Sequence, residues 1–159
     1  MESFIIRKAA ENDVDRIVEI YNSNTEFLKT HLGKNEVNAS FIKQELVEMN
    51  RLDFASCVIE MKEKIVGIMD YQDRDCVYLS LLMLDAREQG KGIGKTCYRL
   101  FESMMKARKR KCIRIDVVCE NSGNLLPFWE SVGFIQNGKS KLVWGEKESE
   151  AVVMKKIIG

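Results

Sequence analysis

The feature that most constrains the fold is an apolar segment followed at once by a glycine-rich loop and a helical pattern. Residues 77–84 read Val-Tyr-Leu-Ser-Leu-Leu-Met-Leu, which predicts a strand covered on both faces at the centre of a sheet. Three glycines then fall within the five positions 90–94, and an apolar stripe of helical spacing runs through residues 93–105. Backbone N–H groups and the helix dipole both attract anions at such a loop. The segment therefore predicts a phosphate cradle.

Strands and helices are predicted on both sides of this segment. Short spacers predict that residues 54–61, 65–71 and 77–84 form an antiparallel meander, preceded by a short strand at 3–7. Helices are expected from Asn12 or Asp13 and from Asn38 or Ser40, each with an apolar face. The apolar positions on these two helices are Val14, Ile17, Val18, Tyr21, Phe41, Ile42, Leu46 and Met49.

The C-terminal part adds a parallel crossover and two further strands. Residues 112–118 predict a buried strand parallel to 77–84. A short helix is expected between a cap at Asn124 and Gly133, with Pro127 in its first turn. Strands follow around 140–144 and 151–157. The order β-α-α-β-β-β-α-β-α-β-β predicts one α+β domain over residues 1–159, a mixed and mostly antiparallel sheet of about seven strands with about four helices.

Composition excludes several function classes. The net charge of +1 argues against a nucleic-acid partner recognised by bulk charge, and the single histidine, His31, argues against a histidine-based metal site. Five cysteines without CxxC spacing predict free thiols in a reducing compartment rather than a zinc site or disulfides. No apolar run approaches the roughly 20 residues of a membrane span, and the N-terminus lacks a signal-peptide pattern. We expect a cytoplasmic protein that binds no metal, membrane or nucleic acid.

The glycine loop fits two nucleotide-binding patterns poorly. Gly94-Lys95-Thr96 looks like the end of a P-loop, but that motif needs four residues between its glycines, and Gly90 and Gly94 enclose three. The dinucleotide pattern GxGxxG also fails, because the glycines here run G-x-G-x-G. A nucleotide-binding phosphotransferase with Lys95 and Asp116 as phosphate and metal residues remains the less favoured alternative.

The same loop resembles a different family. Gln89-Gly90-Lys91-Gly92-Ile93-Gly94 matches [Q/R]-x-x-G-x-[G/A], the acyl-CoA loop of the GNAT N-acetyltransferase superfamily. Residues 115–121 and 128–134 resemble that family's segment of a strand, an Asn, a helix and [Y/W]xxxGF. These motifs cover about residues 77–135, and the order of elements agrees over nearly the whole chain. The N-terminal third, which varies with the acceptor in such families, matches in layout alone.

The resemblance implies acetyl-CoA as co-substrate and assigns residues to it. The strand end Leu82, Met83 and Leu84 would pair with the pantetheine arm, and either Asn121 or Asn124 would bond it as well. The competing role for Asn124 is the helix cap. Trp129 would pack on the arm or in the core. The pyrophosphate would accept hydrogen bonds from the loop, with Thr96 close behind it; the loop residues are Gln89, Gly90, Lys91, Gly92, Ile93, Gly94 and Lys95.

The implied reaction is acetyl transfer to a primary amine of a small molecule or peptide, by direct attack in a ternary complex. An amine of ordinary pKa is protonated at neutral pH, so a group must take its proton. We predict Asp116 or Glu120, whose even spacing places both on one strand face. The alternative for these acids is a salt bridge to the basic residues 106–114. That basic run is either a solvated helix end or a contact to the CoA 3′-phosphate or to RNA.

One departure from the family pattern leaves catalysis itself open. Trp129 stands where many relatives carry a Tyr as general acid, and an indole does not release a proton at neutral pH. Tyr71, Tyr78 or Tyr98 would then serve, or water, or the thiolate would leave unassisted. A non-catalytic acyl-CoA-binding module is therefore the first alternative function. The chain is expected to be a monomer or a homodimer, in the latter case paired through the apolar strand 151–158.

Overall fold

The computed structural model describes residues 3–118, 125–144 and 147–159. Its strands, in chain order, are β1 (Phe4–Lys8), β2 (Phe54–Met61), β3 (Lys64–Gln72), β4 (Cys76–Leu84), β5 (Cys112–Val118), β6 (Ile135–Trp144) and β7 (Lys147–Ile157). The helices are α1 (Val14–Ser23), α2 (Thr25–Phe27), α3 (Ala39–Arg51), α4 (Ile93–Ala107) and α5 (Leu125–Ser131). Shorter helical turns are η1 (Glu11–Asp13), η2 (Leu28–Leu32) and η3 (Ala86–Glu88).

All seven strands form one sheet in the order β1-β2-β3-β4-β5-β7-β6. Every neighbouring pair is antiparallel except β4 and β5, which are parallel because α4 connects them. The strand predicted to be central, β4, is the middle strand of the seven. The predicted α+β fold and its order of elements are therefore confirmed.

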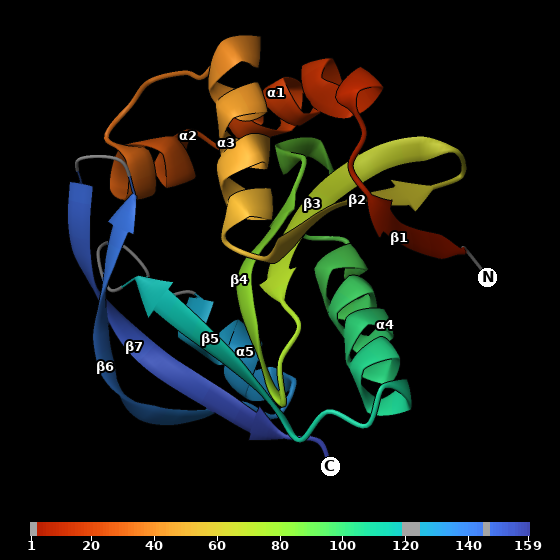
Figure 1. Cartoon of the computed structure of the whole chain (residues 1–159), viewed down its shortest axis with the longest axis vertical. Coiled ribbons are helices and arrows are strands. Elements are labelled where there is room, and N and C mark those ends of the chain that lie inside the picture. Colours follow the sequence, from red (N-terminus) through yellow and green to blue (C-terminus); the bar gives the residue numbers. More distant parts are fainter. Residues whose placement is uncertain (1–2, 119–124, 145–146) are drawn as a thin grey trace.

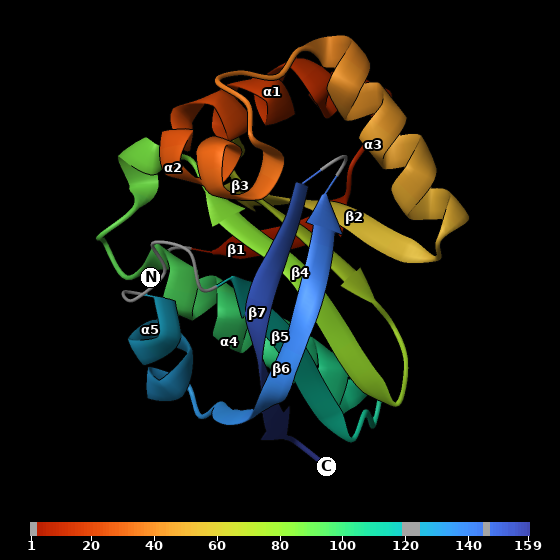
Figure 2. The same cartoon turned by 90° about the vertical axis from the view of Figure 1, so that its left-hand side faces the viewer.

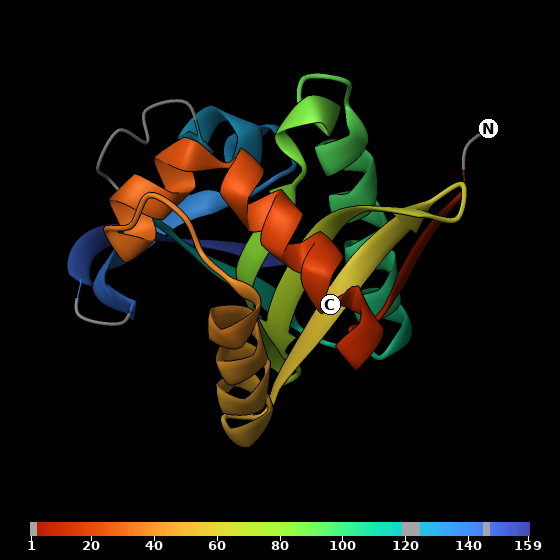
Figure 3. The same cartoon turned by 90° about the horizontal axis from the view of Figure 1, so that it is seen from above.

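Helices cover both faces of the sheet and enclose two cores. α1 and α3 lie across one face, and α4 lies on the other (Figure 1, Figure 3). Beneath α4 the core includes the fully buried Phe101 and Met105, at the helical spacing predicted from the sequence. Beneath α1 and α3 it includes Ile17, Ile20 and Ile42. Each amphipathic helix thus buries its apolar stripe against the sheet.

The central parallel pair is short, and its strands diverge. Pairing joins only Cys76–Tyr78 of β4 to Cys112–Arg114 of β5, and beyond it the two strands separate (Figure 1). A bulge lies where they part: Asp70 pairs with Leu81 and Tyr71 with Leu79, so Ser80 is an extra residue in β4. Residues two apart in a regular strand share one face of the sheet. Because of the bulge, Leu79 instead packs in the core under α4 and Leu81 in the core under α1 and α3. This bulge was not predicted from the sequence.

Several local predictions are confirmed. Asn38 caps α3, because its Oδ1 accepts a hydrogen bond of 2.9 Å from the N–H of Phe41. Pro127 is the third residue of α5, and Gly133 has a φ of 103°, as expected for the glycine that ends a helix. Residues 25–32, which carry no clear pattern, form α2 and η2. The described part of the chain thus holds five α-helices rather than about four.

Two predictions are wrong. Cys76 and Cys112 are neighbours in the β4–β5 pair and form a disulfide, so the expectation of free thiols holds for the buried Cys57 and Cys97 alone; Cys119 lies outside the described residues. Strand register set this proximity, and spacing along the sequence does not reveal it. The apolar strand β7 is paired on both sides, with β5 and β6, so its backbone is not free to pair with a second copy of the chain.

Within the ranges given above, no helix is long and apolar enough to cross a membrane.

Candidate active site

The glycine loop between β4 and α4 has the conformation of an anion cradle. Gly90 and Gly92 both have a φ of 79°, which glycine adopts without strain, and no atom lies within 4 Å of where a Cβ would stand at either residue. α4 begins at Ile93, so the first N–H groups of the helix have no carbonyl partner within it. The N–H and Oγ1 of Thr96 both bond the Gly92 carbonyl, at 3.2 Å each, so Thr96 braces the loop.

The end of β4 exposes backbone groups toward β5. Asp85 donates a backbone hydrogen bond of 2.8 Å to Val66 of the preceding strand. Because groups alternate along a strand, those of Met83 point toward β3, whereas those of Leu82 and Leu84 point toward β5, which no longer pairs there. Two of the three predicted pantetheine residues thus present backbone groups on that side.

The C-terminal end of α1 holds the loop in place. The Leu84 carbonyl accepts hydrogen bonds from Asn24 Nδ2 at 2.9 Å and from Gln89 Nε2 at 3.2 Å. Gln89 Nε2 also reaches Asn24 Oδ1 at 2.7 Å, and the Ser23 hydroxyl accepts from the N–H of Ala86. The Gln89 side chain therefore fixes the loop to β4. Asn24 and Ser23 were missed, because only the fold brings the end of α1 to the loop.

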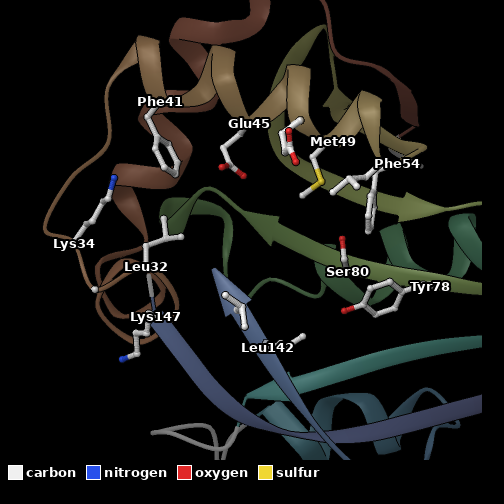
Figure 4. A pocket seen from close by; sticks show the side chains of 14 residues that line it. Leu32, Lys34, Phe41, Glu45, Met49, Phe54, Tyr78, Ser80, Leu142 and Lys147 are labelled. Carbon is white, nitrogen blue, oxygen red and sulfur yellow. The ribbon is translucent and has the colours of Figure 1, made fainter. Parts of the chain in front are cut away.

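A large groove lies on the other side of β4. It has a volume of about 1050 Å³ and runs between α3, η2, β4 and the β6–β7 hairpin. Figure 4 shows Glu45 and Met49 reaching into it from α3, opposite Tyr78 and Ser80 of β4. The hairpin closes the end beside η2, where Lys147 Nζ lies 3.4 Å from the Lys29 carbonyl (Figure 2). Sequence reasoning did not find this groove, because its walls come from four distant segments.

This arrangement agrees with the family comparison. The family model described as "Acetyltransferase (GNAT) domain" matches residues 21–157, which is most of the chain. The chain belongs to the GNAT acetyltransferase family. It is accordingly an acetyl-CoA-dependent N-acetyltransferase, and the family resemblance seen in the sequence is confirmed. The nucleotide-binding phosphotransferase is overturned by this match and by the mostly antiparallel sheet.

Solved structures share the acetyltransferase fold over nearly their full length. A ribosomal-protein-alanine N-acetyltransferase from Brucella melitensis is 24% identical, with a TM-score of 0.70 over 96% of this chain and 99% of that one. PaiA N-acetyltransferase from Thermoplasma acidophilum, in complex with coenzyme A, is 19% identical (TM-score 0.66; 98% and 99% covered). Spermidine N-acetyltransferase from Vibrio cholerae, in complex with CoA and spermine, is 14% identical (TM-score 0.74; 97% and 95% covered). No curated protein matches the chain significantly.

Asp116, one of the two predicted proton acceptors of this acetyltransferase, is buried and already accepts several hydrogen bonds. Its carboxylate is 4% exposed and accepts hydrogen bonds from Arg114 Nε at 2.9 Å and Nη2 at 3.0 Å. The hydroxyls of Ser140 and Tyr78 lie 3.1 and 3.4 Å from its Oδ2. These contacts are those of the ion-pair alternative. Burial and the nearby carboxylate raise the pKa of Tyr78 well above its usual value, so this hydroxyl keeps its proton at physiological pH.

The three tyrosines proposed as general acids, and Trp129, occupy different positions in the structure. Tyr98 is fully buried and donates to Glu102, and Tyr71 is buried against Phe101; of the three tyrosines considered, Tyr78 is the one that lines the groove. Trp129 packs edge-to-face on Tyr98 and on Phe134, at centroid distances of 5.6 and 5.4 Å. These contacts favour the core role over a role at the cofactor arm.

The remaining predicted residues lie away from the loop or outside the described chain. The basic run follows the C-terminal end of α4, roughly 20 Å from its first turn, and Arg108 and Arg110 there bond Asp73. Its position favours a solvated helix end over a phosphate contact. Glu120, Asn121 and Asn124 lie outside the described residues. Among the residues that are placed, no three His, Cys, Asp or Glu side chains lie together as metal ligands would.

Proposed function

We propose that the protein transfers the acetyl group of acetyl-CoA to a primary amine that enters the groove, by direct attack in a ternary complex. The observation that carries this proposal is the position of β4. Its residues Tyr78 and Ser80 form a wall of the groove, and its next residues, Leu82 and Leu84, face the gap toward β5 beside the glycine loop. Two substrates bound at these places would meet at the bulge.

We propose specific roles for the cofactor residues. The N–H groups at the start of α4 bind the pyrophosphate, and Lys91 and Lys95 add positive charge. The backbone of Leu82 and the N–H of Leu84 pair with the pantetheine arm, because the Leu84 carbonyl is already bonded to Asn24 and Gln89. This pairing fixes the thioester beside the bulge. A backbone N–H at this strand end then stabilises the oxyanion of the tetrahedral intermediate. The predicted contacts of Asn121, Asn124 and Trp129 with the cofactor stay predictions.

The roles proposed for Tyr78, Asp116 and Glu120 in proton transfer depend on their charges and their hydrogen bonds. The neutral Tyr78 hydroxyl donates its proton to Asp116, so in the groove its oxygen can accept a hydrogen bond and carries no negative charge. The contacts of Asp116 support an orienting role more than proton uptake, and Glu120 stays a prediction as a proton acceptor. Metal chemistry is not required for the proposed route.

The acceptor class rests on the chemistry of the related enzymes. The structurally similar proteins named above act on a ribosomal-protein alanine or on spermidine, so amines of proteins and of small molecules are both represented. We propose a small-molecule or peptide amine for this chain. The predicted cytoplasmic location and the choice between monomer and homodimer stay predictions.

The experiment that tests this function is a thiol-release assay with acetyl-CoA and a panel of alkylamines, polyamines, amino acids and peptides. We expect release of CoA that depends on at least one amine, with a matching acetylated product by mass spectrometry. Heat denaturation with acetyl-CoA serves as the binding control, because a ligand at about 100 times its Kd adds roughly 2.7 kcal/mol to the free energy of unfolding. Stabilisation by acetyl-CoA without turnover of any amine would instead support the non-catalytic acyl-CoA-binding module.

A further inference from the structure

A buried carboxyl lies beside the proposed reaction site, and none of the described residues pairs with it as a cation. Asp70, in β3, is 7% exposed and pairs across the strands with Leu81, at the bulge of β4. Its backbone carbonyl accepts a hydrogen bond of 3.2 Å from the hydroxyl of Ser80, which itself lines the groove. Side chains of cross-strand partners lie about 5 Å apart at Cβ. Asp70 is therefore close to Leu81 and one residue pair away from Leu82, where the thioester is expected.

The groups around Asp70 do not neutralise it. Tyr21 of α1, Glu45 of α3 and Cys57 of β2 interact with it electrostatically, and none of these is a cation. The Ser56 hydroxyl lies close enough to favour the charged form, but it does not reach hydrogen-bond geometry with any described group. Burial, with a smaller contribution from Glu45, raises the pKa of Asp70 to about 7. Burying a carboxyl without a cationic partner lowers the stability of the fold. Buried acids with a shifted pKa cluster at functional sites.

A narrow crevice lies beside Asp70 and borders the groove. It is lined by Tyr21, Ser56 and Asp70, and it shares Glu45 and Met49 with the groove wall. Its volume of about 20 Å³ is enough for one water molecule, and its lining offers that water several polar partners. Figure 4 shows Glu45 and Met49, the two shared residues, on the α3 side of the groove. A water held in this crevice would offer a proton a route between Asp70 and the groove.

We propose that Asp70 is the proton acceptor for the acceptor amine, acting through this water. In the step, the ammonium group gives one proton by way of the water to the Asp70 carboxylate, and the neutral amine nitrogen attacks the thioester carbon. The C–N bond forms first and gives the tetrahedral intermediate, whose collapse breaks the C–S bond. The leaving thiolate takes the second nitrogen proton, and Asp70 later returns its proton to solvent. The balance is ammonium plus acetyl-CoA to acetamide, CoA thiol and one proton. This proposal rests on the proposed function and completes it.

The test is the pH dependence of kcat/KM for the Asp70→Asn variant, with an amine that the wild-type enzyme acetylates. In the wild type, kcat/KM rises through an apparent pKa near 7, because Asp70 must be ionised. In D70N we expect about a 100-fold loss at pH 7.5 and no inflection near 7, so that the rate follows the ionisation of the amine alone. Asp15→Asn, an exposed acid on α1, is the matched control and keeps the wild-type profile.

Two further measurements separate proton uptake from a structural role. A carbon-13 NMR titration of the free protein should show the Asp70 carboxyl titrating near pH 7. Glu45→Gln, whatever its effect on the maximal rate, should move the inflection to lower pH, because it removes a neighbouring negative charge. A D70N profile that keeps its inflection, or an Asp70 that titrates near pH 4, would overturn the proposal. If no amine is acetylated by the wild type, the proposed function has failed instead.

Discussion

Replacing Gly92 by valine should weaken acetyl-CoA binding at least 100-fold while the sheet stays folded. Gly92 has a φ of 79° and stands immediately before α4. A β-branched residue is strained in this region by about 1–3 kcal/mol, so the loop must move, and the N–H groups at the helix start then lose their alignment. The added side chain also enters the open space above the loop, where no protein atom lies within 4 Å. Isothermal titration calorimetry with acetyl-CoA measures the loss.

Gly138→Val is the matched control for this variant. Gly138, in the edge strand β6, also has a positive φ, of 106°, and no atom within 4 Å of its would-be Cβ. The backbone strain is therefore similar, but the residue is not in the loop. We expect a comparable loss of stability and an unchanged Kd for acetyl-CoA. Equal Kd values for the two variants would show that the loop does not bind the cofactor.

Replacing Asp85 by alanine should cost about 3 kcal/mol of the free energy of unfolding. The Asp85 carboxylate is 1% exposed and joins α1 to the end of β4, because Arg16 Nη2 donates to its Oδ2 at 2.8 Å. Arg87 donates to the same carboxylate from its side chain and its backbone N–H. Removing the carboxylate leaves Arg16, itself 19% exposed, with the exposed Glu19 at 3.1 Å in place of its buried counter-charge. Urea unfolding at pH 7 gives the difference.

The cost of this substitution should depend on pH in a defined direction. The two arginines hold the pKa of Asp85 well below its usual value, and the Arg87 hydrogen bond contributes most. A carboxyl with a lowered pKa contributes stability that is present above its unfolded pKa and is lost as the pH falls through its folded pKa. The difference between wild type and Asp85→Ala is thus full at pH 7 and shrinks below about pH 4.

Asp73→Ala provides the comparison for Asp85. Asp73 also lies between two arginines, with Arg108 Nη1 at 2.8 Å and Arg110 Nε at 2.7 Å, but it is 31% exposed. Solvent weakens such pairs, so we expect a loss of about 1 kcal/mol or less. An equal loss for Asp73 and Asp85 would contradict the view that the buried contact between α1 and β4 holds the loop.

The sequence predicted those parts of the fold that local chemistry specifies. The apolar run of β4, the stripe of α4, the Asn38 cap and the left-handed Gly133 each depend on residues close in the chain. The cofactor loop was found for the same reason: its glycines, its strand and its helix are contiguous. The resemblance of Gln89–Gly94, and of residues 115–121 and 128–134, to a known family agreed with the order of elements that these patterns predicted.

The parts that were missed depend on strand register and on distant segments. The bulge at Ser80 arises from a shift between β3 and β4, and the Cys76–Cys112 bond from the register of β4 and β5. The groove has walls from α3, η2, β4 and the β6–β7 hairpin, so no single segment indicates it. Asp70 reads in the sequence as one polar residue within a strand. Its importance emerges from burial, from the bulge and from neighbours on three other elements.

The most direct test of the central claim is amide hydrogen exchange with and without acetyl-CoA, read by mass spectrometry. We expect slower exchange confined to the end of β4, at Leu82 and Leu84, and to the loop and first turn of α4, residues 89–96. The amides of β6, at the far edge of the sheet, should be unchanged. Protection of another surface, or none at the end of β4 under saturating acetyl-CoA, would contradict the placement of the cofactor between β4 and β5.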